Sequence, residues 1–432
     1  MNRRCFLKLP ALVPLTAINS ALRSKEHHFQ YEGVLGTSMD LVVWTPREHD
    51  ADSVCRTILR EIARLDSILN ARVAHSEISL FESSAGTLTP SRELREVLDA
   101  YNYWERRTGG VLSIRPGGAN TPRNVDALGK AYIIDKALMA GRKACPSIDG
   151  LLLDIGGDIS AWGRPCNISV ADPRRPFDNA APMTTIVLHN AAVATSGTYA
   201  RGHHLIDARN GKPPGNALAA TVVANDAITA NALATMLSVA GAAHGFPIVE
   251  STPGAEALRY EHGTLERTSG FARQERPVFA QTPAPTAWPA SFQLTVLLTL
   301  TSGRSSKRPY VAVWVEDSSG KLVRMLALWG TKSKYYPELS TIWGLTHGIF
   351  SPFRSVTRAT RPAGQYQLLW QGLDENNKPV PLGSYRVIVE TNQEHGTYAK
   401  ESGTIVIGNS PTSITLPSTA NFDQVTVQYG PR

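Results

Sequence analysis

Residues 193–214 read VATSGTYARGHHLIDARNGKPP, a short apolar strand that runs directly into polar side chains. The polar residues and the glycine beside them are Thr195, Ser196, Gly197, His203, His204 and Asp207. Hydroxyl, imidazole and acid groups at the end of a strand predict the wall of a polar pocket. The alternative is a simple hairpin with structural histidines, since the Asn-Gly dipeptide at 210–211 is a strong turn signal between apolar runs.

Length and composition limit the class of protein. A chain of 432 residues predicts two domains, because a single hydrophobic core rarely grows to that size. Hydrophobic residues make up 42% of the chain and charged residues 19%, as in globular proteins and unlike disordered ones. The net charge of +7 is modest, and the basic residues are scattered without interleaved aromatics. We therefore expect no nucleic-acid partner and only a mild attraction to anionic ligands such as phosphates.

Residues 1–24 have the features of a twin-arginine export signal. The sequence NRRCFLK at 2–8 precedes a moderately apolar segment, LPALVPLTAINSAL. That segment is too short, and too interrupted by proline, to span a membrane stably. We expect a periplasmic mature protein without a stable membrane span, and association with the inner membrane surface stays open. An ordinary cytosolic terminus that contains two arginines is the alternative.

Residues 25–271 alternate between helical and strand patterns, which predicts a layered α+β domain. The first helix is expected to begin at an N-cap from Asp52 or Ser53 and to end near residue 69. Further helices are expected from about Ser91 and over 126–142 and 226–237, with strands over 33–45, 151–155, 167–171, 184–189 and 219–224. The proline-rich residues 272–290 lack periodicity and predict a linker.

Residues 291–410 predict an all-β immunoglobulin-like sandwich. Apolar or alternating runs occur at 292–300, 310–317, 322–329, 366–372 and 385–391, separated by turn sequences such as Asp-Glu-Asn-Asn. This region has no evident nucleophile, metal cluster or phosphate loop, so we expect it to bind or scaffold. Residues 411–432 are interpreted as a C-terminal tail.

Several stretches between residues 30 and 270 carry a family resemblance through their order and spacing. They are GTSM at 36–39, NVDALGKAYIID at 124–135, LLDIGGDISAWG at 152–163, the opening stretch at 193–214, and TVVANDAITANALATMLSVAG at 221–241. Together they resemble the ApbE family of FAD:protein FMN transferases. The C-terminal part resembles a periplasmic accessory domain of unknown function that is sometimes fused to this family.

The resemblance implies a Mg²⁺-dependent transfer of FMN from FAD to a Thr or Ser hydroxyl of an exported acceptor protein, with release of AMP. FAD is then the substrate, Mg²⁺ the cofactor and the acceptor protein the partner. His204 would be the general base, Lys130 would pair with phosphate, and Asp207 would hold the loop or orient the histidine. The other residues that the resemblance places at FAD are Met39, Asn124, Ala127, Gly157, Asp158, Thr195, Ser196, Gly197 and Ile206.

The metal site is where this sequence departs from the family pattern. The resemblance places the ion at Ala127, through its backbone carbonyl, and at Asn231 and Thr235. Asn124 and Asn231 both stand where the family has aspartate. An asparagine offers an oxygen but no charge, whereas Mg²⁺ sites normally use one or two carboxylates along with substrate phosphates. We therefore expect weaker metal binding, unless Asp126 or Asp226 compensates; the alternative for both acids is a role at a helix start.

This departure leaves two further functions open. One is a non-catalytic FAD-binding or storage protein with the same fold. The other is a pyrophosphatase that hydrolyses FAD to FMN and AMP, with water in place of the acceptor hydroxyl.

Overall fold

The computed structural model describes residues 24–432, except for 85–86, 119, 175–179, 181, 199–204, 214–218, 277–287, 290, 302–306 and 394–395. The predicted export signal thus lies, apart from its last residue, outside the described residues. None of the described helices combines the length and the apolar character that a membrane span requires.

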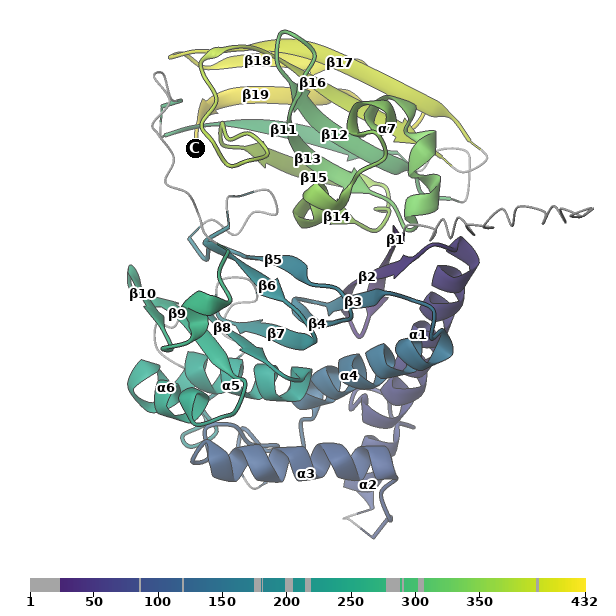
Figure 1. Ribbon diagram of the computed structural model, residues 1–432. Helices are drawn as coiled ribbons and strands as arrows, with labels where there is room; N and C mark the ends of the chain where they lie inside the picture. Colours follow the sequence, from purple (N-terminus) through teal and green to yellow (C-terminus); the bar gives the residue numbers. More distant parts are fainter. Residues whose placement is uncertain are drawn as a thin grey trace, which may run out of the picture.

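An eight-stranded antiparallel sheet is the centre of the first half of the chain (Figure 1). In sheet order its strands are β1 (Lys25–Val34), β2 (Thr37–Thr45), β3 (Gly150–Ile155), β4 (Asp158–Trp162), β7 (Ala191–Ser196), β8 (Ala219–Ala224), β9 (Glu256–Glu261) and β10 (Thr264–Arg267). Side chains alternate between its two faces, as the period of a strand requires. Met39 and Leu41 of β2 join the core beneath the helices, whereas Val42 and Trp44 join a second core with β5 (Cys166–Val170) and β6 (Thr184–Leu188).

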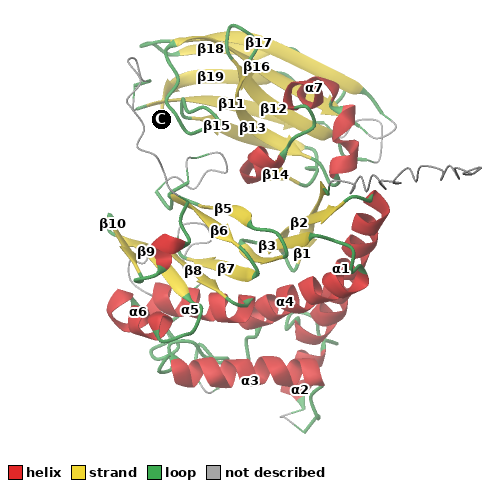
Figure 2. Ribbon diagram, viewed as in Figure 1, coloured by secondary structure: helices red, strands yellow, loops and turns green. Residues whose placement is uncertain are grey.

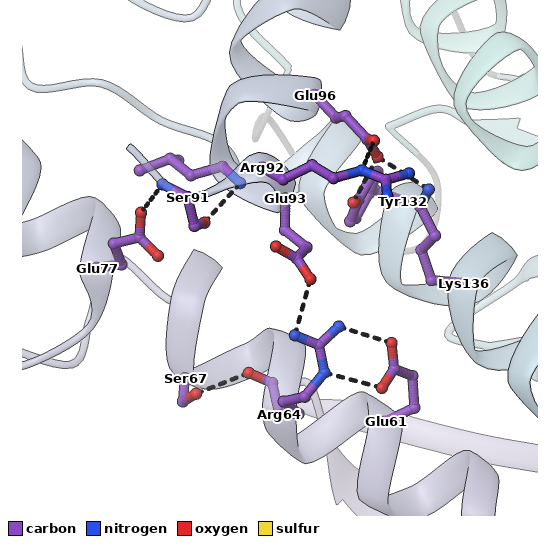
Figure 3. Close-up of polar contacts among 11 residues, drawn as sticks. Glu61, Arg64, Ser67, Glu77, Ser91, Arg92, Glu93, Glu96, Tyr132 and Lys136 are labelled. Atoms are coloured by element: carbon purple, nitrogen blue, oxygen red, sulfur yellow. Dashed lines mark hydrogen bonds and ion pairs between the residues drawn. The ribbon is translucent and has the colours of Figure 1, made fainter. Parts of the chain in front are cut away.

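Helices cover one face of this sheet (Figure 2). The helices against the sheet are α1 (Glu48–Leu69), α4 (Asp126–Ala144), α5 (Ala227–Ala240) and α6 (Ala242–Glu250), and α2 (Glu77–Ser83) and α3 (Arg92–Arg107) pack on their outer side. Surface ion pairs link three of them. Arg64 of α1 contacts Glu93 of α3 at 2.9 Å, and Lys136 of α4 contacts Glu96 of α3 at 2.9 Å (Figure 3).

Two helix starts show where local sequence rules hold and where they do not. Helix α3 begins as predicted, since the Ser91 hydroxyl accepts a hydrogen bond from the Leu94 N–H at 3.2 Å. Helix α1 begins at Glu48, so the predicted cap at Asp52 or Ser53 is wrong. Glu48 and Asp50 lie in its first turn instead, where negative charge complements the helix dipole.

The second half of the described chain forms a β-sandwich. One sheet has the order β15-β11-β19-β18 and the other β14-β13-β12-β16-β17. The strands are β11 (Phe292–Leu300), β12 (Tyr310–Glu316), β13 (Leu322–Trp329), β14 (Thr357–Arg358), β15 (Gly364–Trp370), β16 (Gly383–Asn392), β17 (Tyr398–Ile407), β18 (Thr412–Leu416) and β19 (Val425–Pro431). Helix α7 (Ser340–Thr346) and short 3₁₀ turns at Ser333–Glu338 and Ser351–Val356 join them.

Two boundary predictions need correction. Residues 411–432 are not a tail, because β19 lies inside a sheet between β11 and β18. The predicted linker over 272–290 is shorter than expected. At its start the Arg276 N–H donates to the Thr185 carbonyl at 2.8 Å, and near its end Trp288 is buried in the sandwich core. Short strands and a single tryptophan are weak local signals, and their partners lie far away in the chain.

Ending the chain after residue 410 is expected to unfold the sandwich. The truncation removes β18 and β19 with five fully buried side chains, which are Leu416, Phe422, Val425, Val427 and Tyr429. At about 2 kcal/mol for each buried apolar side chain, the loss is comparable to the whole stability of a domain. Limited proteolysis should then cut the truncated sandwich rapidly, whereas a chain lacking only the exposed Arg432 should resist. Equal resistance of both chains would show that β19 is dispensable.

The sandwich contacts the free edge of β1. The Gln30 N–H donates to the Thr331 carbonyl at 2.8 Å, and Phe29 forms a β-bridge with Lys332. Lys334 of the sandwich also pairs with Glu48 at the start of α1 at 3.1 Å. The edge strand of the first domain is therefore covered by backbone from the second, which protects an otherwise open ladder.

Candidate functional site

A buried ion pair joins the helix layer to the central sheet. The Lys130 ammonium of α4 lies 2.5 Å from a carboxylate oxygen of Asp158, the first residue of β4. The same oxygen accepts a hydrogen bond from the Asn231 side chain of α5 at 3.1 Å. Asp158 is only 4% exposed and Asn231 6%. A buried carboxylate needs such partners, because an unpaired charge in the interior is costly.

Among the described residues, the oxygen of the Asn231 amide has no hydrogen-bond partner. A carboxylate only accepts hydrogen bonds, so the amide NH₂ must face Asp158 and the carbonyl oxygen must point elsewhere. That oxygen is buried and lacks any hydrogen-bond partner among the described residues. An unsatisfied buried acceptor costs about 1–3 kcal/mol and is often the place where a donor or a cation binds.

Hydroxyl groups continue the site along α5 and β7. Thr235 lies one turn beyond Asn231 on the same side of the helix. Its hydroxyl is 3.3 Å from that of Ser196, and Thr195 contacts the Thr221 hydroxyl at 2.9 Å. Ser196 thus brings the end of the opening strand against α5, whereas Thr195, one residue earlier, points to the opposite face of the sheet.

A glycine turn between β3 and β4 aims Asp158 into this cluster. Gly156 and Gly157 have φ values of 61° and 89°, a left-handed conformation that favours glycine. The Gly157 N–H donates to the Asp154 carboxylate at 2.8 Å. No atom of the described chain lies within 4 Å of the position that a Cβ would take on Gly157. The turn therefore presents open backbone beside the ion pair.

Three further residues predicted at the cofactor lie in the core or at the start of α4. Met39 is fully buried in the core, where it pairs across the ladder with Ile155 immediately before the glycine turn. Asn124 is exposed, and its side chain accepts from the Asp126 N–H at 2.9 Å at the start of α4. Ala127 is half-buried in the first turn of α4. No hydrogen bond in the described part of the chain joins Asn124 or Ala127 to Asn231.

The histidine end of the opening stretch is described only in part. His203 and His204 lie outside the described residues, so the predicted general base has no position here. Beyond them Ile206 is 39% exposed. Asp207 accepts hydrogen bonds from Arg209 and bridges to Lys212, and these contacts close the predicted Asn-Gly turn. The Arg209 guanidinium keeps the pKa of Asp207 below its usual range. Asp207 therefore holds this loop.

Neither acid considered as a compensating metal ligand lies in the cluster. Asp126 pairs with Arg72 at 2.6 Å, and Asp226 caps α5 by accepting from the Thr229 N–H at 2.8 Å. The described residues contain no group of three or more His, Cys, Asp or Glu side chains that could hold a metal ion. The carboxylate beside Asn231 is Asp158, which the sequence motif placed at FAD and which Lys130 neutralises here.

Sequence reasoning missed a pair of acidic residues behind the turn. Asp40 of β2 and Asp154 of β3 are direct cross-strand partners on the face opposite the helices. Burial, and for Asp40 the neighbouring Asp154 charge, raise the pKa of Asp40 to about 7. Burial likewise raises the pKa of Asp154 to about 6, although the Gly157 N–H bond opposes this shift. Only the pairing of β2 with β3 makes the two acids neighbours, so no local motif signals them.

Comparison with solved structures shows which known fold the first domain has. Among solved structures, the ApbE protein of Thermotoga maritima MSB8 superposes over 59% of this chain and all of its own, with a TM-score of 0.51 and 21% identity. The flavin transferase ApbE from Vibrio cholerae covers 58% of this chain and 99% of its own, with a TM-score of 0.50 and 18% identity. The first domain therefore has the ApbE flavin-transferase fold.

Sequence comparison gives the families. Residues 118–259 match the ApbE family, and residues 292–424 match a family described as a predicted periplasmic protein, DUF2271. A curated relative, the FAD:protein FMN transferase of Klebsiella pneumoniae (strain 342), is 26% identical over 145 residues. That alignment covers 31% of this chain and 44% of the relative, less than half of its length. The predicted family and the predicted α+β domain followed by a β-sandwich are confirmed.

Proposed function

We propose that this protein is a periplasmic FAD:protein FMN transferase, which moves FMN from FAD to a Thr or Ser hydroxyl of an exported acceptor and releases AMP. The observation that carries the proposal is the buried Lys130–Asp158–Asn231 cluster beside an open glycine turn, on an ApbE fold. A lysine held beside open backbone suits a pyrophosphate, whose negative charge must be neutralised.

The proposed reaction is a phosphoryl-type transfer. The acceptor oxygen forms a bond to the FMN phosphorus, and the bond from that phosphorus to the bridging oxygen breaks, so that AMP leaves with the electron pair. The acceptor hydroxyl gives its proton to His204, the expected general base. Lys130 would exchange its Asp158 partner for a phosphate oxygen, while Thr195, Ser196 and Gly197 form the pocket wall. Met39 and Ile206 would lie against the bound cofactor.

The donor atoms fit a magnesium ion that is shared with the substrate. Ala127, Asn231 and Thr235 would hold the ion through a backbone carbonyl, an amide oxygen and a hydroxyl, and Mg²⁺ prefers oxygen ligands. The unpartnered buried Asn231 oxygen supports this fit. These three donors are neutral, so the phosphates of FAD must supply the negative charge. When bound, the ion would neutralise charge on the pyrophosphate.

The test is to incubate the mature protein with FAD, Mg²⁺ and candidate exported acceptors. We expect a flavin-fluorescent acceptor band and an equal amount of AMP, because one AMP leaves for each FMN transferred. An acceptor whose modified Thr or Ser is replaced by Ala is the control and should stay dark. If a competent family enzyme labels the same acceptor in parallel while this protein does not, the proposal fails.

The neutral metal ligands favour a second candidate, a non-catalytic FAD-binding or storage protein. It predicts FAD that co-purifies with the protein and no AMP release with Mg²⁺. A third outcome, FMN and AMP formed without any acceptor, would identify the hydrolytic alternative. Product analysis with and without acceptor separates all three functions.

A further inference from the structure

The sandwich covers the polar face of β1 and β2. Alternate residues of β1 point toward it, as the strand period requires. Glu26 lies 3.8 Å from Arg354 of the sandwich, Gln30 accepts from the Tyr336 hydroxyl at 3.3 Å, and Glu32 lies 3.8 Å from Arg361. The acidic pair Asp40 and Asp154 belongs to this same face, on the two strands that follow β1 in the sheet.

Arg358 is held at the part of the sandwich that meets this face. It ends β14, which pairs in parallel with β13, and its carbonyl accepts from the Gly330 N–H at 2.8 Å. The next residue, Thr331, accepts from the Gln30 N–H of β1 at 2.8 Å. The strand end that carries Arg358 is thus tied by backbone bonds to the edge of the first domain.

The Arg358 charge acts on both acids of the pair. Its guanidinium lowers the pKa of Asp40 and of Asp154, against the upward effect of burial. The other charged groups facing the pair are Glu32 on one side and Asp158 with Lys130 on the other. Its Nη1 donates to the Thr357 carbonyl at 2.7 Å, which holds the guanidinium at this end of β14. Arg358 is therefore a cation that the second domain supplies to this acidic pair.

Asp154 connects the pair to the flavin site through the glycine turn. Its carboxylate accepts from the Gly157 N–H, and the next residue, Asp158, holds Lys130 and Asn231. An ionised carboxylate accepts more strongly than a protonated one, so the turn is best held when Asp154 carries its charge. Two adjacent buried carboxylates cannot both stay ionised without a nearby cation.

We infer that Arg358 of the sandwich domain is a positioning residue for the flavin site, which keeps Asp154 ionised and thereby fixes the turn that aims Asp158 at Lys130 and Asn231. The inference rests on the proposed function only for its flavin-binding readout. On this inference a residue of the sandwich supports the flavin site of the first domain, so the site is complete only when the two domains are docked.

The first test compares FAD affinity of full-length variants by flavin fluorescence. Arg358→Gln is expected to weaken FAD binding about tenfold. The reason is that a change of one unit in the pKa of Asp154 corresponds to a tenfold change in an equilibrium constant. Arg358→Lys keeps the charge and should stay within about threefold of wild type. Arg354→Gln is the matched control, because it removes an interdomain arginine at the other end of β1, and it should leave FAD affinity unchanged.

A rescue variant separates positioning from simple damage. In Arg358→Gln/Asp40→Asn the second carboxylate is gone, so Asp154 can ionise without the arginine, and FAD affinity should return to near the wild-type value. If Arg358→Gln behaves like Arg354→Gln, or if the double variant is as weak as the single one, the inference is overturned.

A second readout needs no flavin. The pair has raised pKa values when folded, so its contribution to stability is complete below about pH 4 and is lost as the pH rises toward 7. Arg358→Gln should steepen that loss and speed hydrogen exchange of the Gly157 amide at pH 8, and Asp40→Asn should reverse both effects. Unchanged exchange at Gly157 would overturn the inference even if FAD binds. If the Gly157 exchange rates change as expected but the wild-type protein does not bind FAD, the inference stands and the proposed function fails.

Discussion

Replacing Asn231 by Asp is expected to make the stability of the protein depend on Mg²⁺. The substitution removes the NH₂ that donates to Asp158 and places a second carboxylate beside it. Among the described residues, Lys130 is the one cation that contacts Asp158. Without metal we expect a loss of roughly 2–3 kcal/mol in the free energy of unfolding, because both acids are buried. A hundredfold excess of Mg²⁺ over its Kd should return about 2.7 kcal/mol, since a ligand bound only by the folded state stabilises it.

Thermal unfolding with and without Mg²⁺, in the absence of FAD, measures this effect. Wild type should show little response, because its proposed ligands are neutral until FAD contributes phosphates. Asn225→Asp is the matched control, an exposed asparagine before the same helix, and its unfolding should not respond to the metal. A strong Mg²⁺ response of the wild-type protein alone would show that the neutral ligand set suffices. No response in Asn231→Asp would place the ion elsewhere.

Replacing Lys130 by Met is expected to cost more stability than any other single change considered for this site. Asp158 would keep its buried position but lose the cation at 2.5 Å, and an orphaned buried charge costs about 3–5 kcal/mol. FAD binding should also fall, because no other described lysine contacts this cluster. Urea unfolding and flavin fluorescence on the same samples give both numbers.

Lys136→Met provides the control on the same helix. Lys136 pairs with Glu96 at a similar distance of 2.9 Å, but both side chains are about one-third exposed, so the loss should stay below about 1 kcal/mol. FAD affinity should be unchanged, since this pair lies in the surface network between α3 and α4 (Figure 3). Equal losses for the two lysines would mean that the Lys130–Asp158 pair is solvated and not part of a closed site.

Comparison of the two domains shows which elements local sequence could predict. Strands β11 and β13 have the predicted bounds, because alternating or unbroken apolar runs between turn residues determine a strand locally. The caps at Ser91 and Asp226 were equally visible, since a capping side chain bonds within three residues of itself. The order of the motifs also predicted the similarity to the ApbE family, which residues 118–259 match.

The rest depended on contacts between distant parts of the chain. Strands β18 and β19 are short and polar on one face, so they are recognisable only by pairing with each other and with β11. The family motifs in the sequence predicted Lys130 and Asp158 at the cofactor and Asn231 at the metal, and these three side chains are in contact in the structure. Only the tertiary structure shows that Lys130 neutralises Asp158 and that the Asn231 oxygen has no hydrogen-bond partner in the described part of the chain. It also reveals the Asp40–Asp154 pair and its arginine from the second domain, because cross-strand registry and domain docking depend on the packing of the whole chain.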